Sequence, residues 1–356
     1  MTTPLLTMPS NRSTPNSSNL NQGAGEPLAL LPDGKEGEDY YSKYSHFPVK
    51  HLVLEEYYQR HKASLWTPQE IDFAEDRSDW EDNLELDAKR FIKFILCFFA
   101  QADGIVNDNL VDNFIRETSS LKEAGKFYKV QAFMEQIHNE TYSLLIEAFF
   151  RNEEEKKKAY NAIHYYPSIK KISQWVFKWM DPKIPLAERI IAFACVEGIF
   201  FSSAFAAIYW IKKKNILKGL CKANEWIARD EALHTEFAIA LYHVLTGTEK
   251  TCPLIEEKRV HEIIKSATVA AEEFTRDALR VDLIGMNADD MVKYVKCTAD
   301  RLADSLGYNK AYGIENPFDW MAVISLPNKT NFFESKVSEY GRQEEGNFEF
   351  DLDVDF

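Results

Sequence analysis

The sequence predicts an all-α protein, a helical bundle with additional helices, and three observations lead to this prediction. From Val49 to about Glu334 hydrophobic residues recur with helical spacing, whereas strand-like alternation with turn signals is scarce. Residues 190–211 form an apolar run with a single charge, as expected of a buried core helix. Two copies of Glu-x-x-His lie 96 residues apart within the helical pattern.

The elements follow in chain order. Residues 1–38 are rich in Ser, Thr, Asn, Pro and Gly and lack apolar periodicity, which predicts a disordered arm. Residues 39–336 are expected to form one helical domain, in which Thr67 caps a helix beginning at Pro68. Residues 337–356 are expected to form a flexible acidic tail. Four segments are long enough for bundle helices and two more indicate additional helices: Glu85–Thr118, Lys122–Phe150, Pro185–Lys213 and Ile216–Thr246, then Glu256–Leu279 and Ala288–Ser305.

Composition excludes several classes of protein. The net charge of −14 argues against a nucleic-acid-binding surface, which needs a basic stripe. No basic region precedes an apolar stretch at the N-terminus, so we expect no signal peptide and a cytoplasmic location. The cysteines are odd in number and form no Cys-x-x-Cys, which indicates free thiols in a reducing compartment: Cys97, Cys195, Cys221, Cys252 and Cys297.

The two Glu-x-x-His motifs predict a metal centre. Residues three apart share one face of a helix, so each motif can aim a carboxylate and an imidazole at one point. An acidic residue precedes each motif inside an apolar segment, by 32 residues in the first case and 34 in the second. The resulting ligand set is typical of a carboxylate-bridged bundle that holds two iron or manganese ions: Asp103, Glu135, His138, Glu197, Glu231 and His234.

Two alternatives compete with this metal centre. A single Glu-x-x-His can be a solvated pair on a helix surface, but the repetition with upstream acids argues against this. The run 190–211 is also long enough to span a membrane. Glu197 at its centre opposes a span, because an unpaired carboxylate is costly in lipid, whereas a metal would be its partner in a bundle core.

The donor types indicate which metal. Carboxylates with two imidazoles suit iron or manganese better than zinc. Structural zinc would recruit cysteine in a closed site, and no cysteine here is suitably spaced. Six protein ligands leave positions open for water and O2, so the sequence predicts a redox-active pair of ions.

Tyr142 is the next candidate, because it lies four residues after His138 on the same helix face. Phe201 and Phe205 lie four and eight residues after Glu197, and Ile227 lies four before Glu231. These side chains can form a dry cage around the Tyr142 ring, although each also fits an ordinary core position. A phenol shielded from water beside an oxidising metal pair is what a persistent tyrosyl radical needs.

Asp230 directly precedes Glu231 and points about a third of a turn away, so it is not expected to be a ligand. It can instead accept the second ring N–H of His138 or His234, as the outer partner of a metal-bound imidazole does. The alternative is a surface acid paired with Arg229.

Five motifs carry a resemblance to a known family, the small, radical-generating subunit of class I ribonucleotide reductase of eukaryotes and their viruses. The resemblance covers roughly residues 40–356, and Asp103 in place of a Glu also fits it. The motifs are SLWTPQEIDF (64–73), ADGIVNDNL (102–110), MEQIHNETYSLLIE (134–147), VEGIFFSSAF (196–205) and ARDEALHTEF (228–237).

The resemblance implies a ferritin-like fold, a homodimer and an oxo-bridged pair of iron ions activated by O2. Asp103, Glu135 and His138 would bind one iron and Glu197, Glu231 and His234 the other, with Glu135 bridging. Tyr142 would carry the radical within a pocket of Phe201, Phe205 and Ile227. Trp66 would lie near Asp230 and complete a route from His138 to the surface.

The resemblance also assigns roles to the tail. Tyr340 would pass the oxidising equivalent to the large subunit, in which ribonucleoside diphosphates are reduced. The last seven residues would dock there, the aromatic side chains in apolar pockets and the acids on a basic rim: Phe350, Leu352, Asp353, Asp355 and Phe356. A merely solubilising acidic end is the alternative.

Two other functions share the same ligand set. A di-metal oxidase or oxygenase on this scaffold would need neither Tyr142 nor the tail. A ferritin-like iron store would need a many-subunit shell. The sequence also leaves a manganese-containing centre open, and it assigns no role to the N-terminal arm.

Overall fold

The computed structural model describes residues 44–280, 283 and 286–318. Contacts divide the chain into residues 1–47 and 48–356, and the architecture below is that of the second unit. Among the described residues all regular elements are helices, and the one β pairing is an isolated bridge between Leu283 and Met286. The predicted all-α fold is therefore confirmed. The expected arm 1–38 and tail 337–356 lie outside the described residues.

Four long helical segments form the bundle, and they correspond to the four predicted from the sequence. Three of them contain a π-helical stretch that the sequence pattern did not predict. The segments are α4 (Leu86–Asn109) with η2 (Leu110–Phe114) and α5 (Ile115–Glu117); α6 (Lys122–Phe149); α10 (Leu186–Cys195) with η3 (Val196–Phe201) and α11 (Ser202–Lys213); and α12 (Lys218–His243) with η4 (Val244–Thr248).

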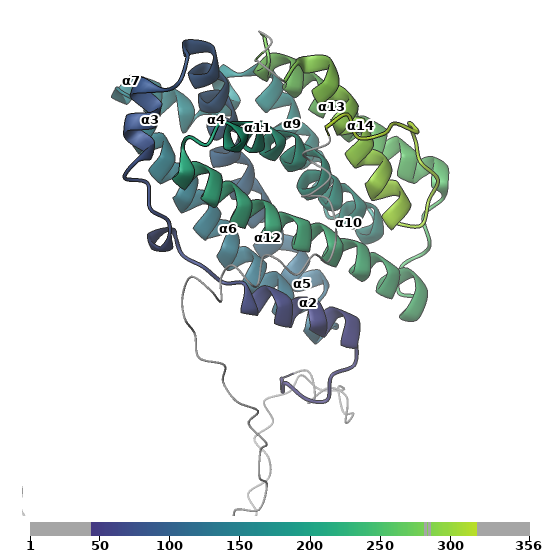
Figure 1. Ribbon diagram of the computed structural model, residues 1–356. Helices are drawn as coiled ribbons and strands as arrows, with labels where there is room; N and C mark the ends of the chain where they lie inside the picture. The colour runs from purple at the N-terminus through teal and green to yellow at the C-terminus, as the bar shows by residue number, and fades with distance from the viewer. Residues whose placement is uncertain (1–43, 281–282, 284–285, 319–356) are drawn as a thin grey trace, which may run out of the picture. The chain divides into compact units, whose positions relative to one another are not determined.

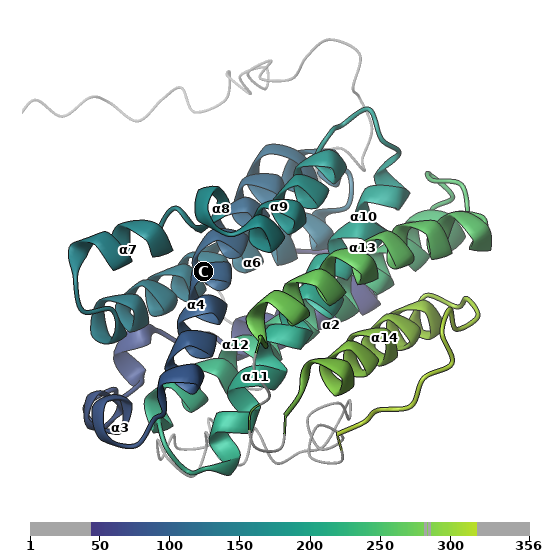
Figure 2. The same ribbon diagram turned by 90° about the horizontal axis from the view of Figure 1, so that it is seen from above.

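The bundle closes on itself. Helix α6 packs against α4 and α12, α12 packs against α10, η3 and α11, and α11 returns to α4. Figures 1 and 2 show these helices running side by side. Each bundle helix therefore turns one face toward a common interior, where hydrophobic side chains from all four are buried.

Further helices cover this bundle. Helix α2 (Leu52–Ala63) lies across α6 and α12, and α9 (Pro167–Trp179), α13 (Glu257–Ala278) and α14 (Ala288–Ser305) pack beside α10 and η3 (Figure 2). Helices α13 and α14 match the two additional helices predicted. The sequence pattern gave no separate bounds for α2, α9 or the short α3 (Asp76–Asp82), α7 (Glu153–Ala159) and α8 (Ala162–Tyr165).

The predicted helix at Pro68 is a single 3₁₀ turn, η1 (Pro68–Glu70), rather than a longer α-helix. Thr67 precedes it, and the Thr67 backbone N–H donates to the Glu70 carboxylate at 2.8 Å. The turn ends at once because Ile71 adopts an extended conformation. This segment connects α2 to α3.

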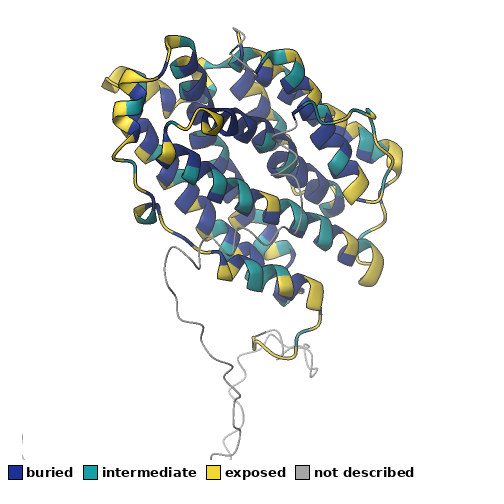
Figure 3. Ribbon diagram, viewed as in Figure 1, coloured by how far each residue is buried: buried dark blue, intermediate teal, exposed yellow. Residues whose placement is uncertain are grey.

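Two helical segments are apolar and long enough to span a membrane, Leu86–Glu117 and Leu186–Lys213. In the second, 89% of the most apolar stretch is buried inside the protein, and the corresponding share in the first is 67%. Figure 3 shows the bundle interior as mostly buried and the outer helix faces as exposed. Both segments thus have the burial expected of core helices.

The start of α12 is set by contacts with α3. Asp76 accepts hydrogen bonds from the backbone N–H groups of Gly219 (2.9 Å) and Leu220 (2.7 Å). Asp79 accepts one from Leu217 at 2.9 Å. Leu217 has a φ of +53°, so the helix begins at Lys218, two residues later than predicted. These carboxylates satisfy orphan donors of the first turn and fix the helix that carries Glu231 and His234.

Candidate metal centre and tyrosine site

The six predicted ligands come from four bundle segments and meet in the interior. None exposes more than 1% of its surface. Asp103 lies on α4, Glu135 and His138 on α6, Glu197 on η3, and Glu231 and His234 on α12. Their convergence follows from the three-residue spacing of each Glu-x-x-His pair and from the packing of α6 against α12.

The ligand atoms form two groups that share one residue. Asp103, Glu135 and His138 offer ligand atoms within 4.8 Å of one another, and so do Glu135, Glu197, Glu231 and His234. Glu135 belongs to both groups, as expected of a carboxylate that bridges two ions. The described residues therefore contain a site of the right composition for two metal ions.

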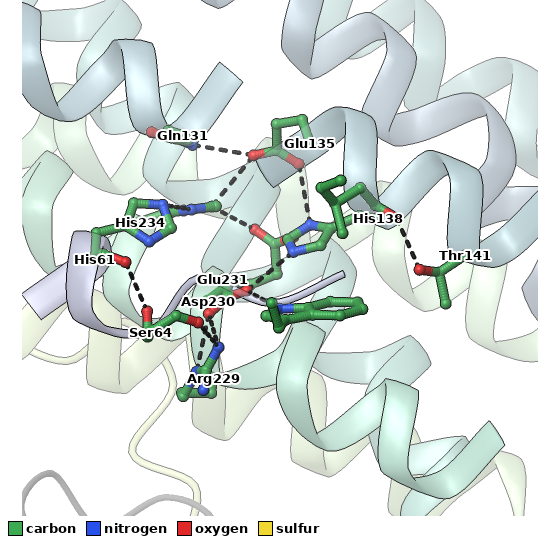
Figure 4. Close-up of polar contacts among 12 residues, drawn as sticks. His61, Ser64, Gln131, Glu135, His138, Thr141, Arg229, Asp230, Glu231 and His234 are labelled. Atoms are coloured by element: carbon green, nitrogen blue, oxygen red, sulfur yellow. Dashed lines mark hydrogen bonds and ion pairs between the residues drawn. The ribbon is translucent and has the colours of Figure 1, made fainter. Parts of the chain in front are cut away.

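Both imidazoles present the same nitrogen to the carboxylates (Figure 4). Nδ1 of His138 lies 3.0 Å from Glu231 Oε1 and 3.4 Å from Glu135 Oε2. Nδ1 of His234 lies 2.8 Å from Glu231 Oε2 and 3.2 Å from Glu135 Oε1. Each ring thus directs Nδ1 inward and leaves Nε2 for an outer partner.

Unsatisfied buried atoms show that the cluster fits metal ions. Both carboxylate oxygens of Asp103 and one oxygen of Glu197 are buried without a hydrogen bond. Unpartnered buried oxygens of this kind are costly unless a cation binds them. Burial, followed by repulsion from neighbouring carboxylates, raises the pKa of Asp103 and Glu197 well above the usual range. Two divalent ions would offset both the cost of burying these oxygens and the repulsion between the carboxylates.

Gln131 is a member of this cluster that the sequence pattern did not reveal. Its side-chain amide donates to Glu135 Oε1 and to Glu197 Oε1, both at 3.2 Å. It is fully buried and lies one turn before Glu135. The i, i+4 spacing from Glu135 was the available signal, but a glutamine on a helix is too common to be singled out by it.

Asp230 lies between His138 and Trp66. Its Oδ2 accepts from Trp66 Nε1 at 2.7 Å and lies 3.2 Å from His138 Nε2, while Arg229 donates to Oδ1. Although burial raises the pKa of Asp230, the Arg229 charge and the His138 hydrogen bond bring it below the usual range. The partner is thus His138 rather than His234, and Arg229 is bound as well (Figure 4).

Tyr142 lies on α6 beside the ligands, and 2% of its surface is exposed. Its hydroxyl makes no hydrogen bond. Burial, followed by the charges of Asp103, Glu231 and Glu135, raises the pKa of Tyr142 well above its usual range. The phenol is therefore held in its neutral, protonated form.

The ring that stacks on Tyr142 belongs to Phe99, which was not among the predicted site residues. The centroids of Phe99 and Tyr142 are 4.5 Å apart, and Phe99 contacts Phe205 (5.1 Å) and Phe201 (5.8 Å) in turn. Ile227 is buried on α12. Phe99 lies four residues before Asp103, so the same face argument that selected Tyr142 would have found it.

His61 of α2 is a further residue that was not predicted. It is fully buried, and its Nε2 lies 2.9 Å from Nε2 of His234. No sequence spacing relates the two, which are 173 residues apart. The remaining predicted site residues lie outside the described part of the chain: Tyr340, Phe350, Leu352, Asp353, Asp355 and Phe356.

Comparisons with known proteins identify the family of this chain. The family model for the ribonucleotide reductase small chain matches residues 43–317. The ribonucleoside-diphosphate reductase small chain of Nicotiana tabacum is 44% identical over 337 residues, which span 92% of this sequence and 100% of that protein. The small chain of Vaccinia virus is 44% identical over 313 residues, which span 87% of this sequence and 96% of that protein.

A solved structure is also similar. The ribonucleotide reductase Rnr4 homodimer of Saccharomyces cerevisiae superposes with a TM-score of 0.68 at 30% identity, and the match spans 84% of this sequence and 90% of that one. The resemblance to eukaryotic and viral small subunits is thereby confirmed. The protein belongs to the family of ribonucleotide reductase small chains, the radical-generating subunits of ribonucleoside-diphosphate reductase.

Proposed function

We propose that this centre holds two iron ions and, with O2, converts Tyr142 to a stable radical that is passed to the large subunit for ribonucleotide reduction. The observation that carries the proposal is the pair of ligand groups sharing Glu135, with Tyr142 one turn beyond His138. When bound, two ferrous ions supply electrons to O2 and the oxidising power that removes one electron from the phenol.

The protein's own groups divide this task. One ion would be held by Asp103, Glu135 and His138, and the other by Glu135, Glu197, Glu231 and His234. Gln131 donates to two of these carboxylates and restricts their rotation. Carboxylates and imidazoles favour iron or manganese over zinc, and of these two we propose iron.

Burial determines how Tyr142 reacts. Because the pKa of the phenol is raised, it does not lose its proton before its electron. Phe99, stacked on the ring, keeps water and reductants away from it and would lengthen the life of the radical.

Asp230 and Trp66 would carry the oxidising equivalent outward. Asp230 Oδ2 accepts the Trp66 N–H and lies beside His138 Nε2, so its negative charge can stabilise the positive charge that forms when Trp66 is oxidised. Tyr340 and the docking residues Phe350–Phe356 would continue the route into the large subunit. We place the protein in the cytoplasm, as a homodimer.

The test is reconstitution of the metal-free protein with ferrous iron and O2, followed by electron paramagnetic resonance and visible spectroscopy. Tyr142→Phe should abolish a tyrosyl radical signal while ferric absorption remains. Tyr128→Phe is the matched control, because Tyr128 lies on the same helix, is buried and also has an unbonded hydroxyl. Ferric bands without a radical in the unaltered protein would contradict the proposal and favour an oxidase or an iron store.

A further inference from the structure

The two candidate metal-binding imidazoles have different outer partners. Nε2 of His138 faces Asp230 Oδ2 at 3.2 Å, and Nε2 of His234 faces His61 Nε2 at 2.9 Å. In both residues Nδ1 faces the carboxylate Glu231. The two rings therefore have the same orientation relative to Glu231, but Nε2 faces a carboxylate in His138 and an imidazole in His234.

Metal binding leaves the His61–His234 pair only one arrangement. A metal ion at Nδ1 of His234 uses the lone pair of that nitrogen, so the ring hydrogen must lie on Nε2. His61 Nε2 must then be the acceptor, because two N–H groups cannot face each other at 2.9 Å. Its own hydrogen lies on Nδ1.

We propose that His61 is a positioning residue, which accepts the Nε2–H of His234 and so holds the Nδ1 lone pair of that ring toward the metal. The inference rests on the metal centre of the proposed function and adds to it a residue on α2. Outer partners of this kind fix ring orientation and raise the basicity of the ligand.

The surroundings of His61 hold its ring in place. The ring packs on Phe127, with centroids 5.2 Å apart, and the His61 backbone carbonyl accepts from the Ser64 hydroxyl at 3.0 Å. Figure 4 shows His61 directed at His234 from outside the carboxylate cluster.

Packing alone does not account for a histidine here. Nδ1 of His61 is buried and makes no hydrogen bond, which disfavours the residue relative to a phenylalanine of similar size. The hydrogen bond to His234 is thus the one polar contact that the side-chain nitrogens of His61 make within the described residues. Its loss should affect the ion held by His234 and spare the ion held by His138, whose partner Asp230 is unchanged.

The experiment is a titration of the metal-free full-length protein with Mn²⁺, following free Mn²⁺ by electron paramagnetic resonance. The unaltered protein should bind two ions per protomer. His61→Phe, which cannot accept, should weaken one of the two by about 10- to 100-fold. His61→Gln places an acceptor oxygen at similar reach and should restore much of the loss.

Two controls separate positioning from packing. Leu54→Ala loosens the same helix at a buried position and leaves His61 intact, so it should lower the melting temperature without weakening either ion selectively. His61→Phe should leave the melting temperature of the metal-free protein unchanged or raised.

Three results would overturn the inference. The first is unchanged affinity for both ions in His61→Phe, and the second is equal weakening of both ions in that variant. The third is selective weakening of the same ion by Leu54→Ala to the same extent as by His61→Phe. If the unaltered protein bound two ions but formed no radical with iron and O2, the proposed function would fail while the inference stood. Absence of Mn²⁺ binding would overturn both.

Discussion

The rings of Phe99 and Tyr142 stack face to face, with centroids 4.5 Å apart and planes inclined by 4°. Phe99 also touches Phe201 and Phe205, so it links the tyrosine to the aromatic side chains of η3 and α11. This contact joins α4 to α6 next to the candidate metal centre. It suggests that Phe99 protects the phenol on the face that it covers.

Replacing Phe99 with leucine tests this protection. Phe99→Leu should still allow the Tyr142 radical to form, but the signal should decay faster, because the smaller side chain admits water to the ring. The lost stacking should also cost about 0.5–1.5 kcal/mol of folding free energy. Decay of the paramagnetic signal measures the first effect. Phe94→Leu, buried on the same helix against Tyr166 and Phe274, should leave the decay rate unchanged.

Asp230→Asn and Trp66→Phe should separate radical formation from radical transfer. Both variants should form the Tyr142 radical, whereas nucleotide reduction with the large subunit should fall by about 10- to 100-fold or more. The reason is that Trp66→Phe removes the N–H that Asp230 accepts, and Asp230→Asn removes the negative charge from that hydrogen bond. Trp226→Phe, which keeps a ring beside Trp66, is the control. Full reduction activity in Trp66→Phe would remove Trp66 from the route.

Gly219→Ala should destabilise the start of α12. A Cβ there would lie 2.5 Å from the Asp72 carbonyl oxygen and 2.9 Å from Asp76 Oδ2, so backbone must shift, at about 1–3 kcal/mol. Gly125→Ala, within α6, meets no atom within 4 Å and should be neutral or stabilising by up to about 1 kcal/mol. The free energies of unfolding of the two variants, measured by urea denaturation of the metal-free proteins, test this difference. Equal stabilities would show that α3 does not clamp α12 closely.

The buried thiols should resist alkylation. Burial raises the pKa of Cys97 and of Cys221 to about 12, so at pH 8 only about one molecule in 10⁴ carries the reactive thiolate at either position. Cys252 is less buried and should react first with iodoacetamide, as read by mass spectrometry. Because these folded-state pKa values exceed 9.0, the ordinary value for a thiol, the thiols favour folding below that pH and lose this contribution as pH rises above it. Labelling of Cys97 as fast as Cys252 would contradict this.

The tail prediction concerns residues outside the described structure. Deleting Phe350–Phe356 should leave the metal centre and radical intact and abolish activity, because the large subunit is no longer bound. Tyr340→Phe should keep that binding and block radical transfer. Affinity for the large subunit, measured by calorimetry, distinguishes the two. Unchanged affinity after the deletion would refute the docking role.

Local spacing accounts for what the sequence predicted well. The bundle helices follow from apolar periodicity, and the three-residue spacing of Glu135 and His138 forces both onto one face. The π-helical stretches were missed, since one extra residue per turn leaves no mark on a hydrophobic pattern. Glu197 lies within one of them, so its exact direction could not be derived from α-helical geometry.

The sequence by itself determined the helical class, the two Glu-x-x-His pairs and Tyr142, because each depends on residues within one or two turns of a helix. The matching acids in the preceding apolar segments added Asp103 and Glu197. Only the tertiary structure decided which outer groups touch them. Trp66 meets Asp230 across 164 residues and His61 meets His234 across 173. Such contacts depend on how α2 and the loop after it pack over α6 and α12, and that packing is set by side-chain shape across the whole core rather than by any local repeat.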